Sequence, residues 1–289
     1  MKTLAGQLAS QAATVVIASQ DRAATHALAE RIAASTGNPT VRGEHLDMTS
    51  LDSVRRFADK FKNTNSWLDG LINTGDMDKT KAVNTHDGHH WQIGVNFLGP
   101  FLLTELLMPL LKISAPARIV HTSCVFHERG ELDLTDLDYR TRKNPGREAW
   151  CQSKLALALY ARAQAKMLEG SGVSAFGVHI GCTQTKTLQF PHISLYRKLL
   201  KILKGSDGLI TTWQSVQTTL HCLLDEESQY HAGEYFSQGS VFYRSRQHRS
   251  GGWPMTSPHP DMQDDQLGLM LYEKAAQLVN LRGVRDKAA

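Results

Sequence analysis

The residues best placed to do chemistry lie in Glu148–Lys166, where apolar side chains recur at helical spacing and predict a helix. Ser153 and Lys154 are adjacent in this stretch, and Trp150 precedes Lys154 by one helical turn. Trp150 and Lys154 therefore share a helix face. An indole N–H donates a hydrogen bond but has no usable acidity, so it cannot pass a proton to a carbonyl oxygen. The stretch therefore predicts a helix with a lysine on this face but no proton-donating acid one turn before it.

Thiols and imidazoles form a second candidate set for a metal or redox site. The four cysteines show no CxxC pair and no disulfide-like spacing, which favours a reducing compartment. A free thiol is ordinarily a small buried hydrophobe, so we predict no metal site. The residues that would converge near the cleft of the fold described below are Cys124, Cys151, Cys182, His121, His127 and His179.

The elements that must position these residues alternate between short β-type runs and amphipathic helical windows, which is typical of a parallel sheet. Strands are predicted at Ala13–Ser19, Thr40–Leu46, Gly70–Asn73, Ala117–Thr122 and Ser174–His179. Further helices are predicted at Leu4–Ser10, Arg22–Ser35, Ser50–Lys62, Gly88–Lys112 with a kink near Pro100, and Asp264–Leu281, with a loop at Val241–Pro260. The chain should therefore form one doubly wound, Rossmann-like α/β domain over residues 1–289, with helices on both faces of a parallel sheet.

Composition agrees with this class. The chain has 289 residues, of which 41% are hydrophobic and 21% charged, with a formal charge of +4 and a pI near 8.8. These values are ordinary for a globular protein. No run of 18 apolar residues is present, so no transmembrane helix is expected.

Five segments in order resemble the short-chain dehydrogenase/reductase family, in its retinol-dehydrogenase-like branch, and the resemblance covers about Leu4 to Leu281. The segments are HLDMTS at 45–50, VNFLGPF at 95–101, RIV at 118–120, the approach to Lys154, and HIG at 179–181 followed by Thr185. The resemblance implies that Asp47 meets the adenine amine, Asn96 anchors a proton-relay water, and Lys154 faces the cofactor. It also implies that the segment ending at Thr185 meets the nicotinamide.

The departures from the family pattern are concentrated at its active site. The resemblance places the catalytic tyrosine at Trp150 and the catalytic serine at Cys124, while the adjacent Ser123 points to the opposite face. The Asn-Asn-Ala-Gly turn reads Asn73-Thr74-Gly75, one residue short, and Ile180 replaces a proline. At the end of the second family strand, Gln20 stands where an arginine usually holds the NADP 2′-phosphate.

The family's first strand and its Gly-rich phosphate loop have no counterpart here, since Gly6 and Gly37 are isolated. This strand is central in the family, so its neighbours, Ala13–Ser19 and Gly70–Asn73, would have unpaired edges. We expect one of three outcomes: the neighbours pair directly, Met1–Gln11 enters the gap, or another polypeptide adds a strand. Of these, a foreign strand or a large partner interface is preferred.

The site residues are therefore predicted to be vestigial. The catalytic positions are Asn96, Cys124, Trp150 and Lys154; the cofactor positions are Asp47, Asn73, Gly75, Lys154 and Thr185. No cofactor is expected. The leading hypothesis is a catalytically inactive accessory subunit of a larger protein assembly. One alternative is an NAD- or NADP-dependent reductase of a retinoid, steroid or lipid carbonyl; another is a non-catalytic nucleotide-sensing protein that keeps Asp47 and Lys154.

Two basic segments bear on partners. Lys186–Lys204 carries five cations, no acid and an apolar stripe, which is typical of a helix that contacts a membrane surface or a partner protein. A lid packed on its own domain is an equal alternative. Arg244–Arg249 lacks interleaved aromatic residues, so no nucleic-acid binding is predicted. The basic pI favours a mitochondrial location, with cytoplasmic and ER-membrane-associated locations as alternatives.

Overall fold

A computed structural model of the chain describes residues 2–74, 84–142, 146–183, 209–237 and 257–281. Two predicted cofactor positions, Gly75 and Thr185, lie outside the described residues. So do the basic segment 186–204 and most of the predicted loop at 241–260.

The N-terminal part contains two β-α units preceded by a helix. Helix α1 (Lys2–Ser10) leads into β1 (Val16–Ser19), α2 (Arg22–Thr36), β2 (Arg42–His45) and α3 (Leu51–Thr64). Asp21 caps α2 by accepting a hydrogen bond from the Ala24 N–H, and Ser50 caps α3 through the Ser53 N–H. Gly37 ends α2 in the left-handed conformation, with φ of +70°, where a residue without Cβ is least strained. The predicted elements are confirmed here, although both strands are shorter than expected.

The central part carries the candidate catalytic residues. It runs through β3 (Gly70–Asn73), α4 (Trp91–Ile93), the π-turn η1 (Gly94–Leu98), α5 (Gly99–Ile113) and β4 (Ala117–Ser123). A 3₁₀ turn, η2 (Val125–Arg129), follows β4, and the predicted active-site helix is α6 (Arg147–Met167), followed by β5 (Val173–His179).

The C-terminal part completes the sheet and covers one of its faces. The elements are β6 (Cys182–Thr183), β7 (Leu209–Ile210), α8 (Thr212–Leu224), η4 (Glu226–His231), β8 (Tyr235–Ser237), η6 (Pro260–Gln263) and α9 (Asp265–Leu278). The sequence analysis did not predict α8 or β8. The closing helix was predicted at Asp264–Leu281, and Asp264 is its N-cap.

The parallel strands divide into two separate sheets in the described residues. One has the order β1-β2 and the other the order β3-β4-β5-β8, while β6 and β7 form a small third pair. All the pairings between these strands are parallel. The break between β1 and β3 lies where the family's central first strand would be. The sequence analysis found no counterpart of that strand in this chain.

Two of the three expected ways to close this gap are wrong. The described strands β1 and β3 do not pair with each other. Residues 2–10 form α1, a helix, so Met1–Gln11 does not enter the gap as a strand. The third possibility, a strand from another polypeptide, remains a proposal.

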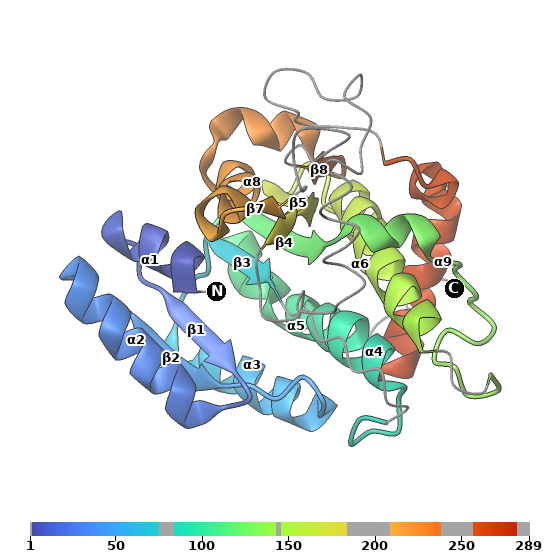
Figure 1. Cartoon of the computed structure of the whole chain (residues 1–289), viewed down its shortest axis with the longest axis horizontal. Helices are drawn as coiled ribbons and strands as arrows, with labels where there is room; N and C mark the ends of the chain where they lie inside the picture. The colour runs from blue at the N-terminus through green and yellow to red at the C-terminus, as the bar shows by residue number, and fades with distance from the viewer. Residues whose placement is uncertain (1, 75–83, 143–145, 184–208, 238–256, 282–289) are drawn as a thin grey trace.

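Helices cover both faces of the larger sheet (Figure 1). Helices α5 and α6 pack on β4 from one side, and α8 packs on β4 and β5 from the other. The two inner strands β4 and β5 are therefore buried at every residue, as expected for central parallel strands. The largest apolar cluster lies between α3, the helices from α4 to α6, and α9. A smaller cluster of α1, α2, β1 and β2 residues forms a separate core.

The predicted helix Gly88–Lys112 is interrupted by a π-turn. The expected kink near Pro100 lies instead at Gly94–Leu98, and Pro100 stands at the start of α5, where its missing N–H costs little. Among the described residues, Trp91–Ile113 is long and apolar enough to span a membrane, and 83% of its most apolar window is buried in the fold. That burial is typical of a core helix in a globular domain.

Candidate functional site

The carboxyl ends of the parallel strands bring the predicted catalytic positions together, as in other open α/β sheets. Strand β4 ends at Ser123 and is followed by Cys124, while α6 passes beside it with Trp150 and Lys154. Ser123 Oγ donates to the Lys154 carbonyl oxygen at 2.9 Å, which fixes the end of β4 against the middle of α6. The side chain of Ser123 is thus used in packing, as the sequence analysis expected from its position.

Lys154 is 1% exposed and lies in the middle of α6. Burial of a lysine is unusual unless charges or polar groups compensate it. Its position one turn after Trp150 on α6 agrees with the sequence prediction that both side chains share a face.

Trp150 packs against the turn that follows β4. Its indole centroid lies 4.8 Å from the Phe126 ring centroid, with the ring planes 43° apart. The Arg147 guanidinium lies 4.5 Å from the centroid of the same Phe126 ring. The family's acid position is therefore occupied by an aromatic side chain stacked on a second aromatic ring.

Cys124 occupies an extended residue at the start of η2, with φ of −148° and ψ of 171°, and is partly exposed. Its carbonyl accepts a hydrogen bond from His127 Nδ1 at 2.8 Å. Because Nδ1 donates, the other nitrogen, Nε2, accepts the Ser257 hydroxyl at 2.7 Å. Burial lowers the pKa of His127 to about 4, so the ring is neutral at physiological pH.

Asn96 lies in the π-turn, a feature that recurs at functional sites. Its amide nitrogen donates to Gln92 Oε1 at 2.8 Å and to Ser153 Oγ at 3.4 Å. Ser153 in turn donates to the Trp150 carbonyl at 2.7 Å. The π-turn and the first half of α6 are thus joined by a buried polar chain, which places Asn96 beside the helix that carries Lys154.

The predicted adenine contact, Asp47, stabilises the turn before α3. Its Oδ1 accepts from the Thr49 N–H at 2.8 Å and from the Thr49 hydroxyl at 2.7 Å. Gln20 Nε2 donates to the other oxygen at 3.2 Å. Asp47 thus has a structural role in this turn, and its Oδ2, which accepts from Gln20, lies on the exposed side.

Asn73 faces the protein core. Its amide nitrogen donates to Thr104 Oγ1 at 3.0 Å and to His121 Nδ1 at 3.2 Å, and the residue is 5% exposed. His121 Nε2 consequently donates to Gln164 Oε1 at 3.1 Å. Both amide hydrogens of Asn73 are therefore used at the junction of β3, β4 and α6.

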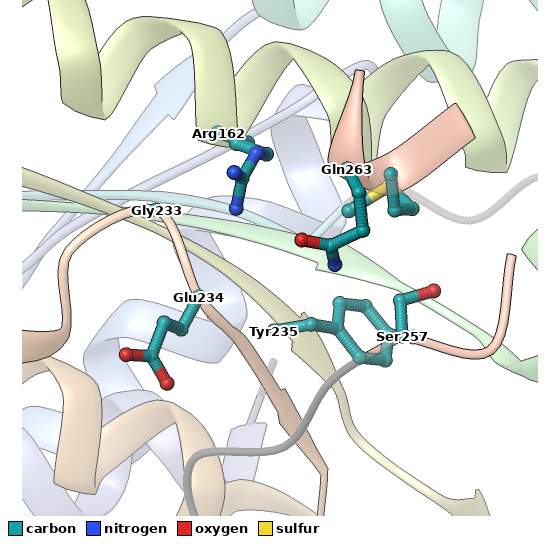
Figure 2. A pocket seen from close by; sticks show the side chains of 7 residues that line it. Arg162, Gly233, Glu234, Tyr235, Ser257 and Gln263 are labelled. Atoms are coloured by element: carbon teal, nitrogen blue, oxygen red, sulfur yellow. The ribbon is translucent and has the colours of Figure 1, made fainter. Parts of the chain in front are cut away.

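A cavity of about 280 Å³ lies elsewhere, and none of the predicted site residues lines it. It lies between the C-terminal part of α6, the start of β8 and η6, as Figure 2 shows. Arg162 at its wall is paired with Asp265, at 2.9 Å between Nε and Oδ1. We therefore place the candidate site at the end of β4 and the face of α6. The remaining lining residues are Gly233, Glu234, Tyr235, Ser257, Met262 and Gln263.

Comparison with known proteins identifies the family. The family model described as enoyl-(acyl carrier protein) reductase matches residues 2–237. Mouse retinol dehydrogenase 13 is 31% identical over 97% of this chain and 80% of its own length. Human retinol dehydrogenase 12 is 38% identical over 82% of this chain and 73% of its own length. The chain belongs to the short-chain dehydrogenase/reductase family. Its relatives support the retinol-dehydrogenase-like branch.

Solved structures agree with the fold. A crystal structure of a putative uncharacterized protein from Mycobacterium paratuberculosis superposes with a TM-score of 0.71 at 27% identity, covering 96% of this chain and 88% of that one. A short-chain oxidoreductase from Pseudomonas aeruginosa, named as NADPH-bound with an atypical catalytic centre, gives a TM-score of 0.65 at 15% identity, covering 84% and 91% of the two chains. The predicted Rossmann-like class is thus confirmed.

The comparisons do not support two functional expectations. The relatives are named as dehydrogenases, which favours an oxidoreductase over an inactive accessory subunit. Structures of the same fold are named as complexes with NADPH or NADP, so the expectation of no cofactor gains no support. The assignment of individual residues as vestigial stays a prediction.

The described residues fit a dinucleotide at its two ends. Asp47 presents one carboxylate oxygen on an exposed turn, where an adenine amine could donate to it. Lys154 and Asn96 lie at the nicotinamide end by the family's pattern. Within the described ranges, no Gly-rich turn leads into a helix where it could hold the pyrophosphate between these ends.

Proposed function

We propose that this chain is an NAD(P)-dependent oxidoreductase that interconverts a carbonyl and an alcohol on a retinoid or a related lipid. The retinol-dehydrogenase relatives, at 31% and 38% identity, support the substrate class. The observation that carries the proposal is the buried Lys154 beside the Asn96–Ser153 chain at the carboxyl end of β4. A steroid ketone is the other carbonyl class that the resemblance implies.

The chain's own residues must bind the carbonyl oxygen and supply its proton. A bound nicotinamide would supply the hydride. The buried ammonium of Lys154 favours negative charge developing on the carbonyl oxygen. Trp150 cannot act as the acid. A thiol S–H can donate a proton, so we assign the proton donation to Cys124, which stands at the family's serine position.

The test is oxidation of NADPH or NADH by the purified chain with retinal, followed by absorbance. We expect slow turnover in the unaltered protein and its loss in Cys124→Ala. Restoring the family's acid in Trp150→Tyr should raise the rate by about 10²–10⁴-fold, the range that general acid catalysis contributes. Trp150→Phe is the matched control, because it keeps an aromatic ring on Phe126 without an ionisable hydroxyl.

Turnover that is unaffected by Cys124→Ala would contradict the role of the thiol. Equal rates in Trp150→Tyr and Trp150→Phe would contradict the idea that only an acid is missing. Binding of NADPH and NADH, measured by calorimetry on the same preparations, separates a failure of chemistry from a failure of cofactor binding.

A catalytically inactive accessory role in a larger, possibly mitochondrial, assembly is the second candidate. The stacking of Trp150 on Phe126 favours it, because that ring fills the acid position with a group that cannot titrate. On this proposal the fold presents surfaces to other subunits, and the basic segment 186–204 contacts a partner or a membrane surface. Absence of turnover and of dinucleotide binding in both the unaltered chain and Trp150→Tyr would support it over the first candidate.

A further inference from the structure

Phe126, in the turn η2 that follows β4, is contacted by one aromatic ring and two guanidinium groups. The Trp150 indole centroid lies 4.8 Å from the centroid of the Phe126 ring. The guanidinium carbons of Arg147 and Arg129 lie 4.5 Å and 5.8 Å from the same centroid. A guanidinium over an aromatic ring is attracted by the negative charge of the ring face. Phe126 therefore holds two positive charges near each other at the edge of the candidate site.

These two guanidinium groups lack an acidic partner within the part of the chain that the structure describes. Other arginines on the same side of the domain, Arg140, Arg142 and Arg162, each pair with an aspartate. Arg129 and Arg147 are both exposed, so their N–H groups are accessible to a ligand. Two neighbouring positive charges without a counterion attract an anion that can approach both of them.

The start of α6 increases the positive potential at this place. The N-cap residue is Gly146, which has no side chain to accept a hydrogen bond from the first turn of this 21-residue helix. The N-terminus of a helix carries a partial positive charge. Glu148 is the acid of the first turn, and its Oε1 lies 2.8 Å from Arg142 Nη1. Its charge is therefore balanced by Arg142 rather than by Arg147.

Exposure increases from the reacting end of the site toward these arginines. Lys154 is 1% exposed, Trp150 and Cys124 are half-buried, and Arg147 is exposed. Arg147 precedes Lys154 by seven residues on α6, which is about 10 Å along the helix axis at 1.5 Å per residue. A substrate whose carbonyl lies beside Cys124 and Lys154 would thus have room for a charged group about 10 Å away, next to Arg147.

We propose that Arg129 and Arg147 form a subsite for a carboxylate of the substrate. The chain then acts on an oxo acid, which is an aldehyde or ketone with a carboxylate at the far end of an apolar chain. The N–H groups of a guanidinium fit the two oxygens of a carboxylate in a bidentate pair. Phe126 is a positioning residue, because its ring lies against both guanidinium groups.

The inference rests on the proposed function for the reaction, but the subsite itself requires only binding. Its recognition of charge adds to the contact that Phe126 and Trp150 offer to an apolar chain. A neutral lipid carbonyl would meet the same aromatic rings without engaging the arginines. The charge on the far end of the substrate is therefore the property to vary.

Calorimetric titration of the full 289-residue chain tests the subsite without turnover. The probes are 9-oxononanoate and its methyl ester, which share the aldehyde and the chain and differ in charge. Each is titrated with and without saturating NADP⁺. We expect the oxo acid to bind at least about tenfold more tightly than the ester in one or both conditions. Equal affinity of the acid and the ester in both, or binding of neither, would overturn the proposal.

Variants assign the preference to the two arginines. The double variant Arg129→Gln and Arg147→Gln should bind the acid no more tightly than the ester. Arg147→Lys keeps the charge but loses the planar fork, so it should keep only part of the preference. Arg31→Gln, at an exposed residue of α2, is the matched control and should keep all of it. Full preference for the acid in the double variant would overturn the proposal, and an unchanged urea midpoint establishes that each variant is folded.

Turnover separates a failure of this proposal from a failure of the proposed function. Tight binding of the acid without oxidation of NADPH would leave the subsite in place and contradict the reaction. Equal kcat/KM for the acid and the ester would leave the reaction in place and contradict the subsite. In an active chain, the double variant should raise KM at least about tenfold for 9-oxononanoate, with kcat and the KM of the ester unchanged. A fall in kcat for both probes would contradict a role in binding the carboxylate.

Discussion

Tyr160 donates its hydroxyl hydrogen to Glu105 Oε1 across 2.6 Å, which joins α6 to α5 in the interior of the domain. Tyr272 of α9 donates to the other carboxylate oxygen at 3.0 Å, and Gln164 donates to Oε1 at 3.3 Å. Gln164 also accepts from His121, which accepts from Asn73. A continuous hydrogen-bonded chain therefore connects the end of β3 to the C-terminal helix through the helices that carry the candidate site.

Glu105 should make stability depend on pH. Burial raises its pKa even though Tyr160, Tyr272 and Gln164 donate to it. The folded state thus favours the protonated form, so this residue's stabilising contribution is present below the unfolded pKa and is lost as pH rises through the folded value. We expect the unaltered protein to lose unfolding free energy relative to Glu105→Gln as the pH rises above the ordinary carboxylate pKa.

Urea unfolding at a series of pH values measures this difference. Glu131→Gln, at an exposed carboxylate, is the control for a change of net charge. Parallel pH curves for the unaltered protein and Glu105→Gln would show that the buried carboxylate is not the source of the dependence. Glu105→Ala, which removes both acceptor oxygens from three donors, should destabilise at every pH by about 2–4 kcal/mol.

His121 and His127 should have the opposite effect at lower pH. Burial lowers the pKa of each to about 4, against an ordinary value of 6.5. A depressed pKa contributes stability above the unfolded value and loses it as pH falls through the folded value, so the loss spans about pH 6.5 to 4. Each ring can account for on the order of 3 kcal/mol, because both are fully buried.

The combined variant His121→Gln and His127→Gln tests this assignment. It should be less stable at pH 7, because it disturbs the bonds to Asn73, Gln164 and Ser257, but its stability should fall less steeply toward pH 4. Thermal unfolding followed by circular dichroism gives the two slopes. Equal slopes would place the acid sensitivity in other groups.

Local sequence signals were sufficient to predict most of the helices and strands. The predicted helix at Arg22–Ser35 begins after Asp21, which caps it with its side chain, and ends at Gly37 in the left-handed conformation. Asp and Gly are residue types that mark helix ends in a sequence. Helix α8 was missed although it begins with a capping box, in which Thr211 and Gln214 bond each other's backbone N–H groups. That Thr-x-x-Gln spacing was present in the sequence. Strand β8, with three residues, is too short for periodicity to identify.

The hydrogen-bond partners of the site residues could not be predicted where they lie far apart in sequence. Asn73 was predicted only as a vestigial cofactor position, and its amide bonds to Thr104 and His121, which lie 31 and 48 positions away. No local pattern encodes such pairs, because they depend on how the strands and helices stack. The burial of Lys154 was unforeseen for the same reason, since the residues covering a helix face come from other elements.

Gly130 should not tolerate a side chain. A Cβ at this position would lie 2.8 Å from the Cys151 carbonyl oxygen and 2.8 Å from Leu155 Cβ, so the turn after β4 approaches α6 too closely for alanine. We expect Gly130→Ala to lower the unfolding free energy by about 1–3 kcal/mol, as overpacking does. Gly6→Ala is the matched control, because nothing lies within 4 Å of its Cβ position, and in the α1 helix it should stabilise by up to about 1 kcal/mol.

Denaturant unfolding of the two glycine variants measures both changes in unfolding free energy, the expected loss in Gly130→Ala and the expected gain in Gly6→Ala. Because Gly130 follows the turn that holds Phe126 against Trp150, Gly130→Ala should also change tryptophan fluorescence, whereas Gly6→Ala should not. A Gly130→Ala protein as stable as the unaltered chain would mean that the turn and α6 are less closely packed than described.

Asn38 holds the small N-terminal core together, and its loss should open that unit first. Its amide nitrogen donates to the Ala9 and Ala13 carbonyls at 2.9 Å each, while its oxygen accepts from the Thr40 N–H and hydroxyl. A side chain that is 7% exposed thus has all its hydrogen-bonding groups satisfied. It joins the end of α1 to the turns before β1 and β2.

Asn38→Asp replaces the two donated bonds by a carboxylate facing two carbonyl oxygens. Each buried carbonyl left without its donor costs about 1–3 kcal/mol, so we expect a loss of about 2–4 kcal/mol in unfolding free energy. Asn84→Asp, at an exposed residue, introduces the same charge and should change stability by less than about 0.5 kcal/mol. Amide exchange should rise in β1 and β2 before it rises in β4 and β5, since the small core is separate from the main one. Uniform destabilisation of all four strands would instead mean that the two sheets unfold as one cooperative unit.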